Sequence, residues 1–237
     1  MLLLTAVFNT ACAQGIETDT MRTASGKEVV LTPIKHASIR IQYDGLEIEV
    51  DPVIKLAPAT DYTQMPKADI VLVTHEHFDH CDKEAVAQLA KETTVVIANP
   101  NSAKILERGD VMVNGDTRQL PHDITLEAVP AYNTSEGRQQ FHPKGRDNGY
   151  VLTLDGLRIY IAGDTEDIPE MGDLRGIDVA FLPCNLPYTM TPEQVSKAAR
   201  VIKPKVLFPY HYGQTKIEEV VQRLEGTGID VRIRNYQ

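Results

Sequence analysis

The sequence predicts an α/β domain made of two similar halves that share one site. In each half an apolar hairpin is followed by a buried strand, a helix and a second buried strand. The hairpins turn at Asp44-Gly45 and Asp155-Gly156, and Asp-Gly pairs favour the tight turns that join antiparallel strands. Strands that alternate with helices favour a sheet covered by those helices. We therefore expect two stacked α/β halves in one domain over residues 28–237, after a leader and linker over residues 1–27.

The first half shows this order from residue 28 onward. A loop interrupted by prolines follows the hairpin and leads to a run of mostly β-branched residues without alternation, which indicates a strand buried on both faces. Asp82 can cap the helix that follows. The expected elements are a strand at 28–32, a hairpin over 38–50, a loop over 52–66, a strand over 70–73, helices over 83–91 and 101–108 with a strand over 94–98 between them, and weak strands within 111–129.

The second half repeats the pattern. Thr191 and Gln194 form a capping box with proline at the first helical position. Thr215 and Glu218 form a second one, before apolar positions expected to face the core. The expected elements are a hairpin over 150–161, a strand over 178–182, a helix over 192–202, a strand over 205–209, a last helix that buries Ile217, Val220, Val221 and Leu224, and a strand over 231–233.

Composition and charge limit the kinds of partner. The chain has 237 residues, of which 42% are apolar and 24% charged, enough for one large domain or two small ones. The net charge of −9 comes without any cluster of lysine and arginine, which argues against a nucleic-acid binder. A small-molecule substrate is expected instead, and a single anionic group is compatible because a metal brings local positive charge. The oligomeric state is not predicted.

Residues 1–13 form a short apolar run that ends in small residues. Ala11-Cys12-Ala13 fits a signal-peptidase site before Gln14, although the basic start typical of such leaders is missing. A lipoprotein cysteine at Cys12 and a disordered or amphipathic arm are the alternatives. The run is too short to cross a membrane. We expect export to the periplasm or beyond if the leader is real, and a cytoplasmic protein otherwise.

The chemistry concentrates in residues 70–80, I-V-L-V-T-H-E-H-F-D-H. The buried strand stops at the threonine, and His75, His77, Asp79 and His80 follow at once. Neutral imidazole and carboxylate ligands suit Zn, Fe, Mn or Co. The place also fits, because α/β sheets bind ligands beyond the carboxyl ends of their strands. A solvated loop with chance histidines is the alternative.

The T-H-E-H-F-D-H segment resembles the H-x-H-x-D-H signature of the metallo-β-lactamase-fold superfamily. Similar segments follow in the family's order, I-A-G-D-T at 161–165 and F-P-Y-H-Y-G at 208–213, and the surrounding sequence is similar to the branch that includes ascorbate-6-phosphate lactonase. The resemblance implies a four-layer αββα sandwich and a metal-dependent hydrolase. It also implies that Asp164 bridges two metals and that His211 is the last ligand. Zn²⁺ is the expected ion, in one or two copies, with Mn²⁺ or Fe as alternatives.

The sequence departs from the family pattern between these segments. One more histidine is expected there, and the corresponding position is Asn133, which becomes a candidate substrate contact. His122 precedes a strand and is expected to be a surface or structural residue. His142 lies in a loop just before the hairpin that leads to Asp164, so it is expected to replace the missing ligand or to contact substrate, with a solvent-exposed histidine as the alternative. Asn133 or water could also fill the position, so the metal count stays open.

The remaining candidates surround this set. His36 precedes the first hairpin and is expected to support a ligand from behind or to contact substrate, with packing as the alternative. Tyr188 follows a buried strand of the second half and is a candidate substrate contact, again with packing as the alternative. Asp51 ends the first hairpin as Asp164 ends the second, and it could orient a ligand or cap a turn. Cys81 could be a soft ligand, but a small buried side chain is the preferred interpretation.

These residues predict a hydrolase that attacks a small ester, lactone or phosphodiester with a metal-bound hydroxide. A metal lowers the pKa of its water from 15.7 to about 7, and Asp79 would ligate the second position and orient that hydroxide. Lys144 and Arg146 share a loop with His142 and could pair with an anionic group, a solvated loop being the alternative.

Other functions are less consistent with the sequence. A non-catalytic metal-binding module is disfavoured because these ligands leave open positions. The resemblance implies that β-lactam hydrolysis occurs in a branch that retains the missing histidine. Because the corresponding position here is Asn133, negligible turnover of β-lactams is expected. An iron redox enzyme would need a flavin segment, and a nuclease would need a basic surface.

Overall fold

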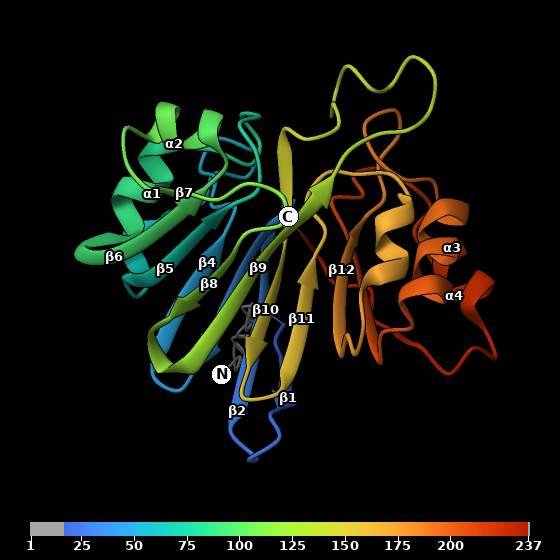
Figure 1. Ribbon diagram of the computed structural model, residues 1–237, viewed down its shortest axis with the longest axis horizontal. Helices are drawn as coiled ribbons and strands as arrows, with labels where there is room; N and C mark the ends of the chain where they lie inside the picture. The colour runs from blue at the N-terminus through green and yellow to red at the C-terminus, as the bar shows by residue number, and fades with distance from the viewer. Residues whose placement is uncertain (1–16, 237) are drawn as a thin grey trace, which may run out of the picture.

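Two seven-stranded sheets lie face to face at the centre of the computed structural model, which describes residues 17–236 (Figure 1). The first sheet contains the strands of the first half in chain order. Its first four strands are antiparallel neighbours, and the rest pair in parallel. They are β1 (Asp19–Arg22), β2 (Glu28–Lys35), β3 (Ser38–Tyr43), β4 (Leu46–Val50), β5 (Ala68–Val73), β6 (Ala90–Ala98) and β7 (Asp110–Val111).

The second sheet repeats this arrangement in the second half, with strand order from β14 back to β8. Antiparallel strands β8 to β11 adjoin parallel strands β11 to β14. The predicted hairpins with Asp-Gly turns are present as β3–β4 and β10–β11. The strands are β8 (Thr117–Leu120), β9 (Ile124–Ala131), β10 (Asp147–Leu154), β11 (Leu157–Ile161), β12 (Val179–Pro183), β13 (Val206–Tyr210) and β14 (Asp230–Val231).

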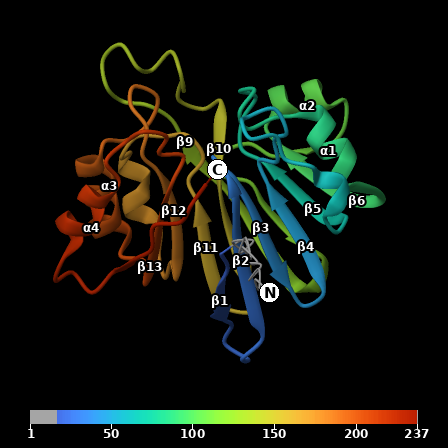
Figure 2. The same cartoon turned by 180° about the vertical axis from the view of Figure 1, so that it is seen from behind.

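Helices cover the outer face of each sheet, so the layers run helix, sheet, sheet, helix (Figure 1, Figure 2). The helices α1 and α2 lie outside the first sheet, and α3 and α4 lie outside the second. The four-layer αββα sandwich of two similar halves is therefore confirmed. The helices are α1 (Lys83–Leu89), α2 (Pro100–Leu106), α3 (Pro192–Ile202) and α4 (Glu218–Leu224), with 3-10 turns η1 (Tyr62–Gln64), η2 (Pro121–Asp123) and η3 (Pro169–Asp173).

Apolar side chains fill the spaces between these layers. The inner faces of the two sheets meet in one cluster, where Ile48 of β4 and Ile159 of β11 are fully buried. Outside the sheets, Val86 of α1 and Val195 of α3 anchor their helices in two further clusters. Burying each such side chain contributes about 1.5–3 kcal/mol. The sheets therefore form a rigid frame for the loops at their ends.

The start of the described chain differs from its expected character. A linker is predicted to residue 27, whereas β1 pairs with β2 along Met21↔Val29. The carboxylate of Asp19 accepts hydrogen bonds from Arg232 at 2.8 Å and from Arg234 at 2.7 Å. These contacts with the far end of the chain order a polar segment whose own sequence lacks a strand pattern. The predicted leader, residues 1–13, lies outside the described residues.

Helix ends are the other corrections. The first helix stops at Leu89 rather than residue 91, because Ala90 already pairs with Ala68 in the sheet. The two bonds of the capping box predicted at the start of α3 are present. The last helix has no side-chain cap, and Val221 is 36% exposed instead of buried. Within residues 17–236 no helix is long and apolar enough to cross a membrane.

Candidate metal centre

The loop after β5 carries the four polar side chains that the sequence singles out. β5 is buried from Ile70 to Val73, so its rigid end fixes where this loop begins. His75 and His80 are fully buried behind the loop, while the side chains of His77 and Asp79 are partly exposed and line a pocket. The loop after one buried strand thus provides both buried and partly exposed candidate ligands at the same site.

Three imidazoles form a first group of possible ligands, His75, His77 and His142. His75 Nε2 lies 3.1 Å from His77 Nδ1. The ring centre of His142 lies 5.0 Å from that of His75 and 4.8 Å from that of His77. Nitrogen ligands around tetrahedral zinc are about 3.3 Å apart, because each lies about 2.0 Å from the ion. The spacing suits one ion held by three nitrogens.

A second group consists of Asp79, His80, His211 and His36, whose ligand atoms all lie within 4.8 Å of one another. Asp79 Oδ2 lies 3.6 Å from His211 Nε2 and 4.0 Å from His80 Nε2. His36 Nε2 donates to the same Asp79 oxygen over 3.0 Å, and its ring centre is 3.7 Å from that of His211. His36 thus contacts two other members of the group and is absent from the pocket lining, unlike the substrate contact predicted for it.

The carboxylate of Asp164 lies between the two groups. One oxygen is 3.4 Å from His80 Nε2, and the other is 3.3 Å from His142 Nε2 and 3.4 Å from His211 Nε2. Gly163 makes this approach feasible, because its φ is +65° and an added Cβ would lie 2.8 Å from the carbonyl oxygen of Asn148. A carboxylate in this place can bind an ion in either group or in both.

Several buried atoms in these groups have no hydrogen-bond partner, which is unusual for the interior of a protein. They are His80 Nε2, Asp164 Oδ1 and both ring nitrogens of His211. Leaving such atoms unpaired is costly, by about 1–3 kcal/mol each. A cation bound by His80 Nε2, Asp164 Oδ1 and His211 Nε2 would satisfy these three atoms, so the residues present fit a metal.

Asp51 supports the ligand loop from behind. It is fully buried and accepts hydrogen bonds from the backbone N–H and the hydroxyl of Thr74, each at 2.7 Å. It also accepts from His80 Nδ1 at 2.9 Å. The Thr74 hydroxyl in turn lies 3.0 Å from His75 Nδ1. These bonds leave Nε2 of both histidines free for an ion, the usual arrangement behind metal ligands.

His142 has a similar carboxylate partner at the start of β10. Its Nδ1 donates to Asp147 over 3.1 Å, so that Nε2 faces Asp164. Asp147 also accepts two hydrogen bonds from Arg146, at 2.6 and 2.8 Å. His142 is only 1% exposed, which rules out the solvent-exposed alternative.

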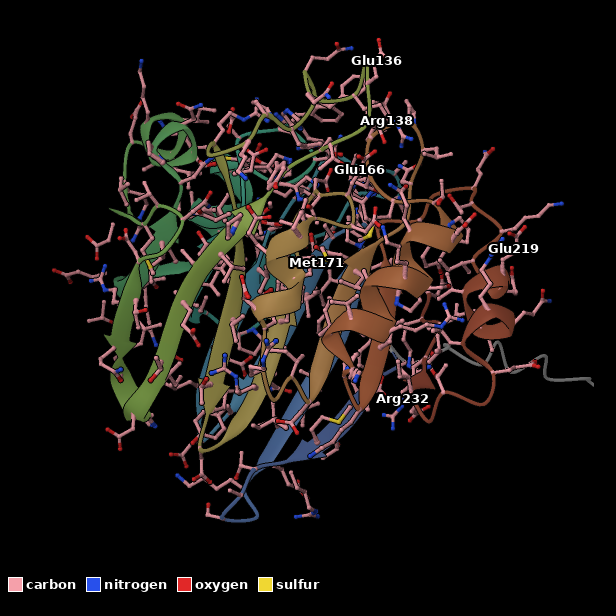
Figure 3. The ribbon with its side chains drawn as sticks, turned by 45° about the vertical axis from the view of Figure 1, so that its right-hand side comes forward. Glu136, Arg138, Glu166, Met171, Glu219 and Arg232 are labelled. Atoms are coloured by element: carbon pink, nitrogen blue, oxygen red, sulfur yellow. The ribbon has the colours of Figure 1, made fainter. Side chains whose placement is uncertain are left out.

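The β9–β10 loop, residues 132–146, rises above the sheets in Figure 1 and is tied down by a buried glutamate. Glu166 accepts a hydrogen bond from the backbone of Ser135 at 2.7 Å and pairs with Arg138 at 3.0 Å. Figure 3 shows Arg138 between Glu136, near the tip, and Glu166 below. The loop is therefore braced against the second half.

Burial and neighbouring charges set the protonation of the ligands. Burial, together with the nearby His80, lowers the pKa of His75 well below its usual range, and burial also lowers the pKa of His77. Both imidazoles are therefore neutral at pH 7 and able to bind a metal. Burial alone would raise the pKa of Asp164, but His211 and His80 hold it well below its usual range. That carboxyl group is therefore ionised.

The pKa values of two other histidines are raised instead of lowered. Burial opposes their charge, but Asp164 raises the pKa of His80 well above its usual value, and Asp147 raises that of His142. Without an ion, these imidazoles hold protons between carboxylates. Metal binding must displace those protons, as it does at other imidazole sites.

Two residues considered for the missing ligand lie elsewhere. The amide of Asn133 donates to the backbone carbonyls of Arg138 and Tyr188, at 3.2 and 2.7 Å. Asn133 is absent from the pocket lining, so it braces the loop rather than facing a substrate. His122 is on the surface, 3.2 Å from Asp44, as predicted.

Of the two alternatives for Lys144 and Arg146, the structure does not show the anion-binding pair. Lys144 points to Glu170 at 2.8 Å, and Glu170 lines a different hollow beside η3. Arg146 is held by Asp147 and lies 3.1 Å from Glu76. Neither cation lines the pocket. The loop instead folds so that carboxylates of the protein itself neutralise both charges.

Sequence reasoning does not single out Asp147 or Glu166. Asp147 ends the segment H-P-K-G-R-D, directly before a buried strand, and that place is the signal that could have found it. Glu166 has no comparable signal, because its partners are backbone groups of a loop distant in the sequence.

Both groups of ligands open into one pocket of about 510 Å³. Small-molecule sites usually measure about 300–1,000 Å³, so the size suits a small substrate. Apart from possible ligands, its walls are Glu76, Phe78, Phe141 and Tyr188. Tyr188 thus lies where the sequence predicts a pocket contact.

Comparison with known proteins shows which family the chain is similar to. A family model described as the beta-lactamase superfamily domain matches residues 30–211. A metal-dependent hydrolase from Methanopyrus kandleri is 30% identical over 219 residues, which cover 86% of this chain and 94% of that protein. A crystal structure from Parabacteroides distasonis, assigned as a metal-dependent hydrolase, is 56% identical with a TM-score of 0.90, covering 94% of this chain and 100% of that one. A metallo hydrolase from Ignicoccus hospitalis is 28% identical with a TM-score of 0.72, covering 88% and 95%.

Proposed function

The chain belongs to the metallo-β-lactamase-fold superfamily and is a metal-dependent hydrolase, and on that basis we propose that it cleaves a small ester, lactone or phosphodiester. The observation that carries the proposal is the pair of ligand groups around Asp164, whose unpartnered buried atoms open into a pocket of substrate size. The alternative of a non-catalytic metal-binding module does not explain why the ligands line a pocket.

Two metal positions are proposed. The first would be held by His75, His77 and His142, and the second by Asp79, His80 and His211, with Asp164 shared between them. Zn²⁺ is the preferred ion because the donors are imidazole and carboxylate, and Mn²⁺ or Fe are the alternatives. When bound, such an ion lowers the pKa of a coordinated water and polarises the oxygen of the bond under attack.

The protein's own groups position the reactants. Asp79 has a side chain that is 20% exposed and lines the pocket, so it can accept a hydrogen bond from the attacking water and orient it. His36 donates to Asp79 and fixes the direction of that carboxylate. Phe141 and Tyr188 form one wall of the pocket.

Export is a separate part of the proposal. It depends on residues 1–13, whose apolar run and small residues resemble a signal sequence. Fractionation of cells that produce the full chain tests it, and a product found only in the cytoplasm at full length would contradict it.

Metal analysis combined with a substrate panel tests the function. We expect the purified protein to contain metal, to lose activity with a chelator and to regain it with Zn²⁺ or Mn²⁺. The panel contains a nitrophenyl ester, a γ-lactone, bis(p-nitrophenyl) phosphate and nitrocefin. Turnover of at least one of the first three, with negligible turnover of nitrocefin, supports the proposal. Full activity in metal-free protein, or nitrocefin as the best substrate, contradicts it.

A further inference from the structure

Phe78 stands out at the mouth of the pocket. It lies in the chain between two possible ligands, His77 and Asp79, yet its side chain is 78% exposed. It also lines the pocket. Exposing a large apolar ring to water is unfavourable, and exposed apolar groups around a cleft often mark the place where a ligand is bound. Its two chain neighbours belong to the metal centre, so the backbone places this ring beside the site.

A second aromatic surface contributes to the same pocket. Phe141 precedes His142 in the β9–β10 loop, and Tyr188 lies in the loop after β12. Their ring centres are 5.1 Å apart with an angle of 73° between the planes, an edge-to-face pair. Tyr188 remains 45% exposed despite this contact. Two loops from different parts of the chain thus present aromatic carbon to one cavity.

The charged residues around the pocket also disfavour an anionic ligand group. Among the described residues, no lysine or arginine lines it. Arg146, next to Phe141 in space, donates to the carbonyl of that residue at 2.7 Å and to Asp147 at 2.8 Å. Glu76 lines the pocket with a carboxylate held by Asn99. Arg146, 3.1 Å from Glu76, is already paired with that carboxylate and with Asp147, so a negatively charged group away from the metal centre would meet a carboxylate and no unpaired cation among the residues that line the pocket.

We propose that Phe78, Phe141 and Tyr188 bind the part of the substrate that does not react, and that this part is an uncharged aromatic or branched aliphatic group. The inference rests on the proposed function, because it names the class of substrate for the same site. It narrows the small ester, lactone or phosphodiester to one with an apolar substituent, in place of the anionic substituent that the sequence suggests.

Two matched pairs of substrates test the inference on the metal-loaded protein. One pair is γ-phenyl-γ-butyrolactone and γ-carboxy-γ-butyrolactone, and the other is ethyl phenylacetate and monoethyl succinate. We expect kcat/KM to be about tenfold or more higher for the phenyl member, since it buries apolar surface that the carboxylate cannot bury. A carboxylate member that reacts as fast as its phenyl counterpart overturns the inference.

Single substitutions test which residues cause the preference for the phenyl substrates. Phe78→Ala and Tyr188→Ala should each lower the ratio of kcat/KM between the pair members by about threefold or more. Ile105→Ala is the matched control, because Ile105 is 46% exposed on α2 and does not line the pocket. It should leave the ratio unchanged. An unchanged ratio in both aromatic variants overturns the inference even if the phenyl substrates are preferred.

Calorimetry separates this inference from the proposed function. If neither pair is hydrolysed, these ester and lactone bonds are excluded from the proposed function, and binding decides the inference. The probes are 2-phenyltetrahydrofuran and 2-tetrahydrofuroate, which contain no bond to hydrolyse. Tighter binding of the phenyl probe, weakened by Phe78→Ala, supports the inference. Equal binding of the two probes, or no effect of the variant, overturns it.

Discussion

The loops after β5 and β12 hold matching places in the two halves but carry different side chains. β4 and β5 pair in parallel with Ile48 opposite Ile70, and β11 and β12 pair in parallel with Ile159 opposite Val179. Both loops therefore leave the same end of their sheets. The first provides candidate ligands at four positions, and the second, residues 184–189, contributes none to the groups found in residues 17–236.

The difference shows how one backbone arrangement serves two purposes. The loop after β5 is drawn inward, because Asp51 accepts from Thr74 and from His80. The loop after β12 is closed by its own bonds, since the hydroxyl of Thr189 accepts from the N–H of Asn185 at 2.7 Å. Its side chains are left to shape the pocket. The loop after β5 thus carries metal ligands, whereas the loop after β12 contributes Tyr188 to the wall of the pocket.

The largest expected effect breaks this division directly. His77→Ala should weaken metal binding by about 100-fold or more, since even the loss of a partner behind a ligand costs about 10–100-fold. Tyr188→Ala, at the matching loop, should retain the metal of the parent protein. Elemental analysis after dialysis against a weak chelator measures both. Loss of metal in the Tyr188 variant would show that the second loop also holds the ion.

A comparison of two histidine variants tests the ligand set within the second half. The residues are His142 and His122. His142→Ala removes a nitrogen 3.3 Å from Asp164, so metal content and turnover should fall about 10-fold or more. His122→Ala changes an exposed residue and should behave like the parent protein. The same metal analysis and ester assay apply. Parent-like behaviour of both variants would show that His142 is not a metal ligand.

Asp51→Asn tests the support behind the first loop. The amide keeps the volume but provides only one oxygen for the three hydrogen bonds that Asp51 accepts. We expect about 10–100-fold weaker metal binding, as for other partners behind ligands. Asp44→Asn is a control, because Asp44 pairs with Lys27 on the surface. Equal metal affinity in both variants would contradict a supporting role for Asp51.

Much of this architecture could be predicted because it depends on local patterns. The Asp-Gly turns and the alternation of apolar residues give both hairpins, and Ile70 to Val73 lead directly into the ligand loop. The fold class follows from the repetition of these elements. The ligands near β5 could be found because they adjoin one another in the chain.

The remaining features depend on contacts between distant segments. β1 is ordered by pairing with β2 and by the arginines that bind Asp19, and neither contact leaves a pattern in residues 19–22. The pairing of Lys144 with Glu170 could not be predicted, because Glu170 lies in another element. Asp147 was missed for a similar reason, since its role depends on how the β9–β10 loop folds back. The local sequence shows no pattern that would predict such packing.

The smallest predicted effect is on the pH dependence of the free energy of unfolding. It differs between the hairpins of the two halves. In the first, Arg40 lies opposite Glu49 in a buried ion pair, and in the second, Val151 lies opposite Tyr160. Burial raises the pKa of Glu49 from 4.5 to about 7, although Arg40 opposes the rise. The folded protein therefore binds a proton more tightly than the unfolded chain does. The stability from this proton is fully present below pH 4.5 and is lost as the pH rises to about 7.

Glu49→Gln removes this titration while keeping the shape of the side chain. The free energy of unfolding of the parent protein, relative to that of the variant, should fall by on the order of 1–3 kcal/mol as the pH rises through that window. Urea unfolding with a chelator present at every pH measures the difference, because the histidines contribute equally to both proteins and cancel. Tyr160→Phe in the second hairpin should give a flat difference over the same range, since a tyrosine with a pKa raised by burial does not titrate there. A flat difference for Glu49→Gln as well would mean that Arg40 keeps the glutamate ionised in the folded state, and the two hairpins would then respond to pH alike.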